Sequence, residues 1–295
     1  MPIAHILPPH IKELSPGFNV RRSLPAAALQ SIGPFLFFDH FGPLSARPGD
    51  NHDVRPHPHI GLATVTYLFE GAMDHRDSIG SFQRIEPGAI NWMTAGAGIV
   101  HSERTPPDLA RTGWRSHGLQ LWVGLPRPFE EAAPSFQHVP ASRIPLWFGD
   151  GVKAKVLIGE LHQQRSPVTT FSRTLYLDID AVPRSTFVLP ARMESASVER
   201  GCYSVDNAIE VDGVELPPFT LAALETGKDT LIRAPLGARY VVIGGEPLDG
   251  RRHMWWNFVS SSRERIEVAK QAWTNQAMGQ VPGETEWIPL PLPLQ

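Results

Sequence analysis

The chain has 295 residues, enough for two domains of ordinary size that each bury a core without a disulfide or a structural metal. Cys202 is its single cysteine, which excludes an intrachain disulfide and a thiolate-rich zinc or iron–sulfur site and favours the reducing cytoplasm. The net charge is -3 and no basic stripe is present to neutralise phosphates, so we expect no direct binding of nucleic acid.

Turn-forming residues interrupt the chain at short intervals. Its 29 prolines and 25 glycines fall between short apolar runs, a pattern typical of many brief strands joined by tight turns. None of the apolar runs approaches the ~20 residues of a membrane-spanning helix, and residues 1–14 lack the features of a secretory signal. We therefore expect a soluble, cytoplasmic, mainly β protein that does not bind membranes.

The clearest strands are predicted by apolar alternation with a period of two residues. They cover residues 64–69, 118–125, 173–181 and 239–245. In the second of these, Leu119, Leu121 and Val123 share one face, whereas Gln120 and Trp122 share the other. Two faces of such different character suit antiparallel sheets that pack one side on a core.

Two further elements follow from local signals. A hairpin is predicted over residues 208–216, because Asp212 and Gly213 separate two apolar-alternating arms and Gly accepts the positive φ of a primed turn. A helix is predicted from about Ser261, which has capping-box spacing to Glu264. The apolar residues that recur on one face of this helix are Ile266, Ala269 and Trp273.

Two pairs of potential metal ligands recur with the same spacing. His57 and His59 flank Pro58, and His101 and Glu103 follow about one strand-turn-strand excursion later. On a strand, residues two apart point to the same face, so each pair presents its side chains side by side. Pro58 lacks a backbone donor, which suits a sheet edge or the start of a strand. Two such pairs on neighbouring strands can converge on one point.

Three imidazoles and one carboxylate suit Fe(II), Mn, Ni, Co, Cu or Zn and suit Ca poorly. On a six-coordinate metal they leave open positions, which mark a catalytic or ligand-binding ion rather than a structural one. An isolated His-x-His is more often a pair of surface histidines, and the second pair is what favours a metal here. Eleven of the twelve histidines precede residue 163, so the second half of the chain cannot assemble a site of this kind.

Two other classes of site lack support in the sequence. A Ser-His-Asp hydrolase would need a G-x-S-x-G elbow, which is missing. Nucleotide binding would need a G-x-G-x-x-G between strand and helix or a G-x-x-x-x-G-K-[ST] loop, and neither occurs.

Three segments, residues 34–43 ("PFLFFDHFGP"), 57–80 and 87–103, carry a combination typical of one family. With them the chain resembles the pirin family, a branch of the cupin superfamily, over most of its length. The resemblance implies an all-β bicupin, in which two antiparallel β-barrels of the jelly-roll type carry a few short helices, one of them near the C-terminus.

The Pro-containing stretch at 138–151 is the predicted boundary between the two domains. The expected N-terminal cupin, residues 1–140, binds the metal. The expected C-terminal cupin, residues 141–295, has no metal site and carries the C-terminal helix and tail.

The resemblance assigns the metal ligands to His57, His59, His101 and Glu103 and implies iron as the usual metal. Ala63 departs from the pattern, because general cupins and many pirins have a glutamate four residues after the second histidine. The four expected metal ligands are all present, but a polar group expected near the pocket is missing.

The activity that the resemblance implies is quercetinase-like, the O2-dependent opening of a flavonol ring with release of carbon monoxide. The partners would then be O2 and a small aromatic, flavonol-like substrate whose proton Glu103 accepts. Animal pirins imply an alternative, a non-enzymatic iron-dependent redox sensor that binds a protein partner. A third reading is a protein that binds and modulates a metabolic enzyme.

Overall fold

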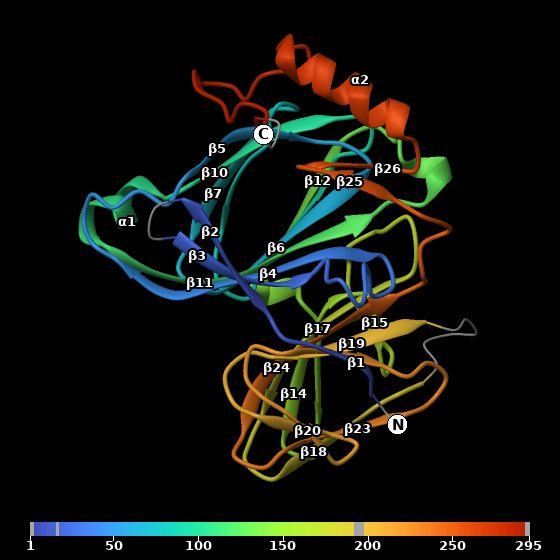
Figure 1. Ribbon diagram of the computed structural model, residues 1–295. Coiled ribbons are helices and arrows are strands. Elements are labelled where there is room, and N and C mark those ends of the chain that lie inside the picture. Colours follow the sequence, from blue (N-terminus) through green and yellow to red (C-terminus); the bar gives the residue numbers. More distant parts are fainter. Residues whose placement is uncertain (1–2, 16–17, 192–197, 293–295) are drawn as a thin grey trace. The chain divides into compact units, whose positions relative to one another are not determined.

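The computed structural model describes residues 3–15, 18–191 and 198–292 (Figure 1). The contacts within it divide the chain into two compact units. Each unit is built mainly from antiparallel sheets, which confirms the predicted all-β class and the bicupin architecture. The first unit comprises Met1–Leu14, Asn19–His40 and Ser142–Pro247, and the second comprises Ser15–Phe18, Phe41–Ala141 and Leu248–Gln295.

The two ends of the chain belong to other units than a division at residue 140 would give them. The junction between Ala141 and Ser142 falls inside the predicted boundary. However, β1 (Ile3–Leu7) pairs with β22 (Leu221–Leu224) in the first unit, and α2 (Arg263–Thr274) packs within the second. The units therefore differ from the predicted ranges 1–140 and 141–295, because strand pairing and burial of an apolar helix face decide which segments group together.

Two sheets enclose an apolar core in the first unit. The larger has the strand order β1-β22-β19-β24-β17-β14-β13 and the smaller the order β18-β23-β20-β21. Phe187 from the smaller sheet and Leu177 and Tyr240 from the larger belong to one buried cluster. The strands not yet given bounds are β13 (Leu146–Gly149), β14 (Val152–Ile158), β17 (Thr174–Ala181), β18 (Ser185–Leu189), β19 (Glu199–Ser204), β20 (Ile209–Val211), β21 (Val214–Leu216), β23 (Thr230–Ala234) and β24 (Ala238–Gly245).

Two sheets also form the second unit. The larger has the order β12-β9-β6-β11-β4, and the smaller, which carries the predicted ligands, has the order β5-β10-β7-β8. The strand β4 begins in the first unit and is followed in the strand order by β3 and β2. The bounds are β2 (His10–Ser15), β3 (Phe18–Leu24), β4 (Phe35–Ala46), β5 (Val54–His59), β6 (Leu62–Glu70), β7 (Met73–Asp77), β8 (Phe82–Ile85), β9 (Ile90–Thr94), β10 (Ile99–Arg104), β11 (Trp114–Gly124) and β12 (Ser135–Val139).

The remaining elements are short. They are α1 (Pro107–Thr112), two 3-10 turns (Arg127–Phe129 and Ala141–Arg143), and the two-stranded pairs β15 (Glu160–Leu161) with β16 (Gln164–Arg165) and β25 (His253–Trp255) with β26 (Phe258–Ser260). Within the described ranges, no helix combines the length and the apolar character needed to cross a membrane.

The predicted strands and hairpin are confirmed. The four alternating segments lie within β6, β11, β17 and β24, apart from one residue at an end of two of them. The hairpin is formed by β20 and β21. Its turn residues, Asp212 and Gly213, have φ values of 47° and 83°, and two positive φ values are what a primed turn requires.

The helix α2 begins one residue later than its capping-box spacing indicated. Ser262 is the N-cap, because its Oγ accepts a hydrogen bond from the backbone N–H of Arg265 at 3.2 Å. Ser261 is bound elsewhere, since its backbone N–H and its hydroxyl both donate to the carboxylate of Glu130. The predicted apolar face is confirmed by the buried residues Ile266, Ala269 and Trp273.

Candidate metal centre

Two neighbouring strands of the smaller sheet in the second unit carry the predicted ligands. His57 and His59 lie on β5, and His101 and Glu103 lie on β10. The two strands are antiparallel, with His101 directly opposite His57. β5 is an edge strand, the position that Pro58 favours. Local alternation and this register together bring the histidines to one face of the sheet.

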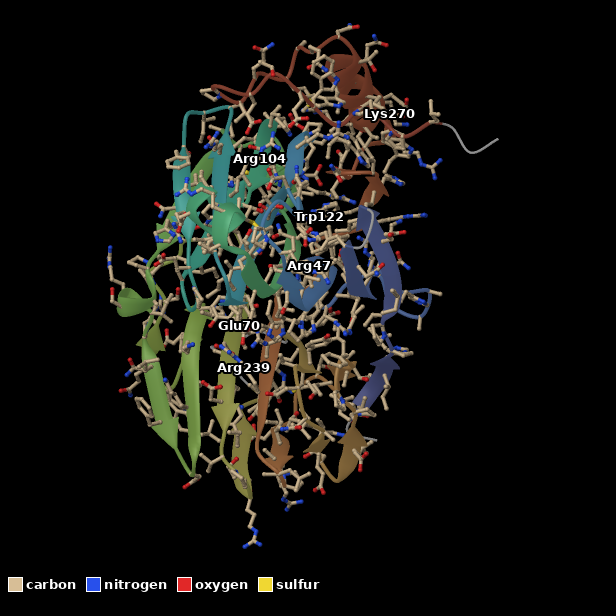
Figure 2. All side chains as sticks on the ribbon, turned by 90° about the vertical axis from the view of Figure 1, so that its left-hand side faces the viewer. Arg47, Glu70, Arg104, Trp122, Arg239 and Lys270 are labelled. Carbon is tan, nitrogen blue, oxygen red and sulfur yellow. The ribbon has the colours of Figure 1, made fainter. Side chains whose placement is uncertain are left out.

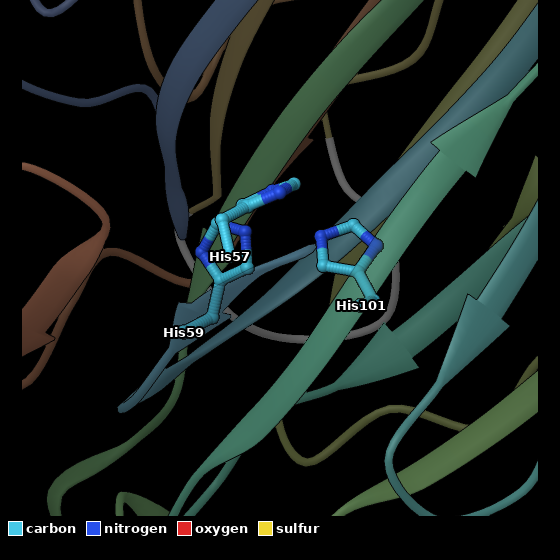
Figure 3. Close-up of side chains that lie close together, drawn as sticks. All are labelled: His57, His59 and His101. Atoms are coloured by element: carbon cyan, nitrogen blue, oxygen red, sulfur yellow. The ribbon is translucent and has the colours of Figure 1, made fainter. Parts of the chain in front are cut away.

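The three histidines form a cluster (Figure 3). One ring nitrogen from each of His57, His59 and His101 lies within 4.8 Å of the others. Their ring centroids are 4.3 to 5.1 Å apart, and all three residues are buried. Three imidazole nitrogens in this proximity make a donor set suited to a divalent transition metal.

Burial keeps these imidazoles neutral. It lowers the pKa of His57 to about 4. Burial, followed by the charge that neighbouring imidazoles would carry, holds the pKa values of His59 and His101 well below the ordinary 6.5. A metal binds the lone pair of a neutral imidazole, so at neutral pH the three histidines have no proton to lose before an ion binds.

Hydrogen bonds determine which ring nitrogens are available. Nδ1 of His57 lies 2.9 Å from the carbonyl oxygen of Arg55, and Nδ1 of His59 lies 3.2 Å from that of Asn257. Because a carbonyl only accepts, each Nδ1 carries the hydrogen and each Nε2 carries the lone pair. Both nitrogens of His101 are enclosed without a hydrogen-bond partner among the described residues. An enclosed polar atom without a partner is costly, and a metal ion would relieve that cost.

Glu103 lies two residues from His101 on β10, but its carboxylate does not belong to the group of ligand atoms within 4.8 Å. Its Oε1 is enclosed and has no hydrogen-bond partner in the described part of the chain. Burial raises the pKa of Glu103 from 4.5 to about 7. The roles of Glu103 as fourth ligand and as base stay predictions. The unpartnered Oε1 supports them.

A buried pair of polar residues, His75 and Asp77, lies next to the cluster, and its carboxylate was not predicted from the sequence. His75 on β7 lies directly opposite Glu103, and Asp77 lies opposite His101. Nε2 of His75 is 2.9 Å from Oδ2 of Asp77, so it donates to this carboxylate. The ring of His75 lies 5.4 Å from that of His101 and stacks on Phe136. The sequence contained one signal for this pair, because His75 and Asp77 have the same i, i+2 spacing as the two predicted ligand pairs.

Trp122 of the larger sheet, labelled in Figure 2, lies next to the cluster. Its ring centroid is 5.2 Å from that of His59. Trp122 pairs with Thr64, whereas Ala63 pairs with Val123 on the opposite face of the sheet. A glutamate at position 63 would therefore point away from the cluster. The expectation that Ala63 removes a polar group from the pocket was wrong, because position 63 is one residue out of phase with the lining.

Two family models match the chain. The Pirin model matches residues 17–123, and the model of the Pirin C-terminal cupin domain matches residues 176–279. A pirin-like protein from Caulobacter vibrioides is 44% identical over 279 residues, which are 93% of this chain and 94% of that protein. Pirin from Homo sapiens is 34% identical over 260 residues, which are 86% of this chain and 85% of that protein.

Solved structures show the same likeness over the whole fold. A quercetin 2,3-dioxygenase from Acinetobacter baumannii has a TM-score of 0.90 and 34% identity, and the match covers 99% of this chain and 96% of that chain. The matches include both cupin segments and the strands that carry the histidine cluster. The chain therefore belongs to the pirin family of the cupin superfamily.

Proposed function

We propose that the chain is a mononuclear metal-dependent dioxygenase, which opens the ring of a flavonol such as quercetin with O2 and releases carbon monoxide. The observation that carries this proposal is the cluster of three buried, neutral imidazoles. Fe(II) is the ion that we infer, and Mn, Ni, Co, Cu and Zn suit the same donors. The likeness to the quercetin 2,3-dioxygenase of Acinetobacter baumannii supports this activity.

The residues of the cluster have separate tasks. His57, His59 and His101 would hold the ion, with Glu103 as the fourth ligand. When bound, the ion supplies Lewis-acid chemistry and electron exchange with dioxygen. Glu103, if released from the ion, would accept the proton of the flavonol ring hydroxyl on its carboxylate.

Aromatic side chains of the larger sheet would hold a flat substrate beside the cluster. Trp122 lies against His59, and Phe136 stacks on His75 with ring centroids 4.4 Å apart. Both aromatic residues come from the sheet opposite the ligand strands. Apolar walls with a few polar groups are typical of sites for small aromatic molecules.

Aerobic incubation of the metal-loaded protein with quercetin tests the proposal. We expect the visible absorbance of quercetin to fall, with carbon monoxide released in equal amount. His101→Ala should abolish turnover, because it removes one of the three imidazoles. His10→Ala is the matched control and should leave the rate unchanged, because His10 is exposed on β2.

A metal-loaded protein that leaves quercetin and other flavonols unchanged would contradict the dioxygenase. It would favour the alternative, a non-enzymatic iron-dependent redox sensor that uses the same ion site. That alternative predicts a protein partner whose affinity differs between the Fe(II) and Fe(III) forms, and His101→Ala would remove the difference.

A further inference from the structure

The C-terminal part of the second unit contacts both ligand strands. We call residues 281–290, which follow α2, the C-terminal strap. Because side chains alternate along β10, Ser102 points away from the face that carries His101 and Glu103. The strap binds Ser102 on this outer side.

Glu284 anchors the strap on β10 (Figure 2 labels Arg104). Its Oε1 accepts hydrogen bonds from Oγ of Ser102 at 2.9 Å and from Nε of Arg104 at 3.0 Å, and its Oε2 pairs with the same guanidinium. The side chain of Glu284 is only 8% exposed, and the hydrogen bond from Arg104 lowers its pKa. Since Ser102 lies between His101 and Glu103, this carboxylate holds the backbone that carries both.

Ile288 anchors the strap on β5. Its backbone N–H donates to the carbonyl oxygen of Pro56, the residue before His57, at 2.8 Å. Its own carbonyl oxygen accepts a hydrogen bond from Nε1 of Trp273 at 3.0 Å. Trp273 is buried in an apolar cluster in which α2 packs against Ile60 and Phe258. Ile288 therefore links the edge strand β5 to α2.

The hairpin of β25 and β26 contacts the ring of His59 directly. The carbonyl oxygen of Asn257 in its turn accepts from Nδ1 of His59 at 3.2 Å. The backbone N–H of Val259 donates to the carbonyl oxygen of Ile60 at 3.2 Å. Gly61 has a φ of +67°, and a Cβ there would lie 2.0 Å from the carbonyl oxygen of Val259. Only glycine permits this close approach, which holds the chain next to His59.

We propose that residues 253–290 are a positioning element of the metal centre, which holds β5 and β10 in the arrangement at which His57, His59 and His101 share one ion. This inference rests on the proposed metal site. It predicts that loss of a buried contact between the strap and a ligand strand weakens metal binding and alters the ligand geometry although all ligands are intact, whereas loss of an exposed strap contact does not. Outer partners of metal ligands typically change metal affinity by roughly 10- to 100-fold.

Co(II) is the probe, because its visible absorption reports the geometry of its ligands. In the full-length protein, Glu284→Ala and Ser102→Ala should each weaken Co(II) binding about 10-fold and shift the absorption bands. Ser102→Ala removes a single hydroxyl, so it tests the contact even where Glu284→Ala disturbs folding. Glu286→Ala is the matched control. Glu286 also binds Arg104, at 2.9 Å, but its side chain is 48% exposed, and we expect wild-type Co(II) affinity and absorption.

Wild-type Co(II) affinity and absorption in both Glu284→Ala and Ser102→Ala would overturn the inference. It would also be overturned if the variants lowered only the free energy of unfolding of the metal-free protein and left the Co(II) spectrum unchanged. If the wild-type chain bound no Co(II), the metal centre itself would fail. None of these readouts depends on flavonol turnover, so the two proposals fail separately.

Discussion

The carboxyl group of Glu103 links metal affinity to pH. Burial raises its pKa to about 7, so close to half of these groups hold a proton at neutral pH in the metal-free protein. A carboxylate ligand must lose that proton, whereas the imidazoles are already neutral. Metal affinity measured by competition titration should fall about tenfold per unit as pH drops below 7 and should level off above it.

Glu103→Gln separates this effect from general weakening of the site. The amide keeps the shape of the side chain but does not titrate, so the variant should bind more weakly and show no rise in affinity between pH 6 and 8. The pKa of His57, about 4, lies too low to produce such a rise. Equal pH dependence in the variant and the wild type would show that Glu103 is not a ligand.

At the same scale, local geometry explains why three of the four predicted ligands were found together. His57, His59 and His101 meet because residues at i and i+2 share a strand face and β5 pairs with β10. The carbonyl of Asn257 could not be predicted, since 198 residues separate it from His59. The position of Asp77 opposite His101 depends in the same way on the pairing of β7 with β10, which no local signal gives.

The apolar face of helix α2 should contribute to the stability of the second unit. Ile266 is 3% exposed and packs in the cluster with Phe258, whereas Val268 on the same helix is 60% exposed. Ile266→Ala should therefore lower the free energy of unfolding of the metal-free protein by about 2–5 kcal/mol. Val268→Ala, the matched control, should change it by less than about 0.5 kcal/mol. Denaturant unfolding followed by circular dichroism checks both, and equal losses would mean that this face does not hold the helix.

Strands with strict alternation were predictable as elements, and their partners were not. β6, β11, β17 and β24 have period-two patterns, and the turn of β20 and β21 has its own chemical signal. β1 lacks such a pattern, with three consecutive exposed residues, and it is held by pairing with β22. The start of α2 was displaced because Glu130, distant in sequence, binds Ser261. Local signals thus identify elements, while distant contacts set their ends and neighbours.

On the scale of the whole molecule, chain order and compact units do not coincide. The strand β1 joins the unit built mostly from residues 142–247, and the segment from residue 248 onward joins the unit with the histidine cluster. Composition predicts a boundary near residue 140. It does not predict that the C-terminal segment returns to the unit with the histidine cluster, because this depends on contacts between residues distant in sequence. This return is what allows Asn257 and Glu284 to support the ligand strands.

The two units predict a metal stoichiometry of one ion per chain. The second unit brings three neutral imidazoles together, whereas the two sheets of the first enclose an apolar cluster. His40 in the first unit is buried, and its Nδ1 lies 2.7 Å from the hydroxyl of Tyr203. Elemental analysis after loading with excess Fe(II) or Ni(II) and desalting should therefore give one ion per chain. His101→Ala should reduce that value towards zero and His40→Gln should leave it unchanged, whereas two ions per chain would mean that the first unit also carries a site.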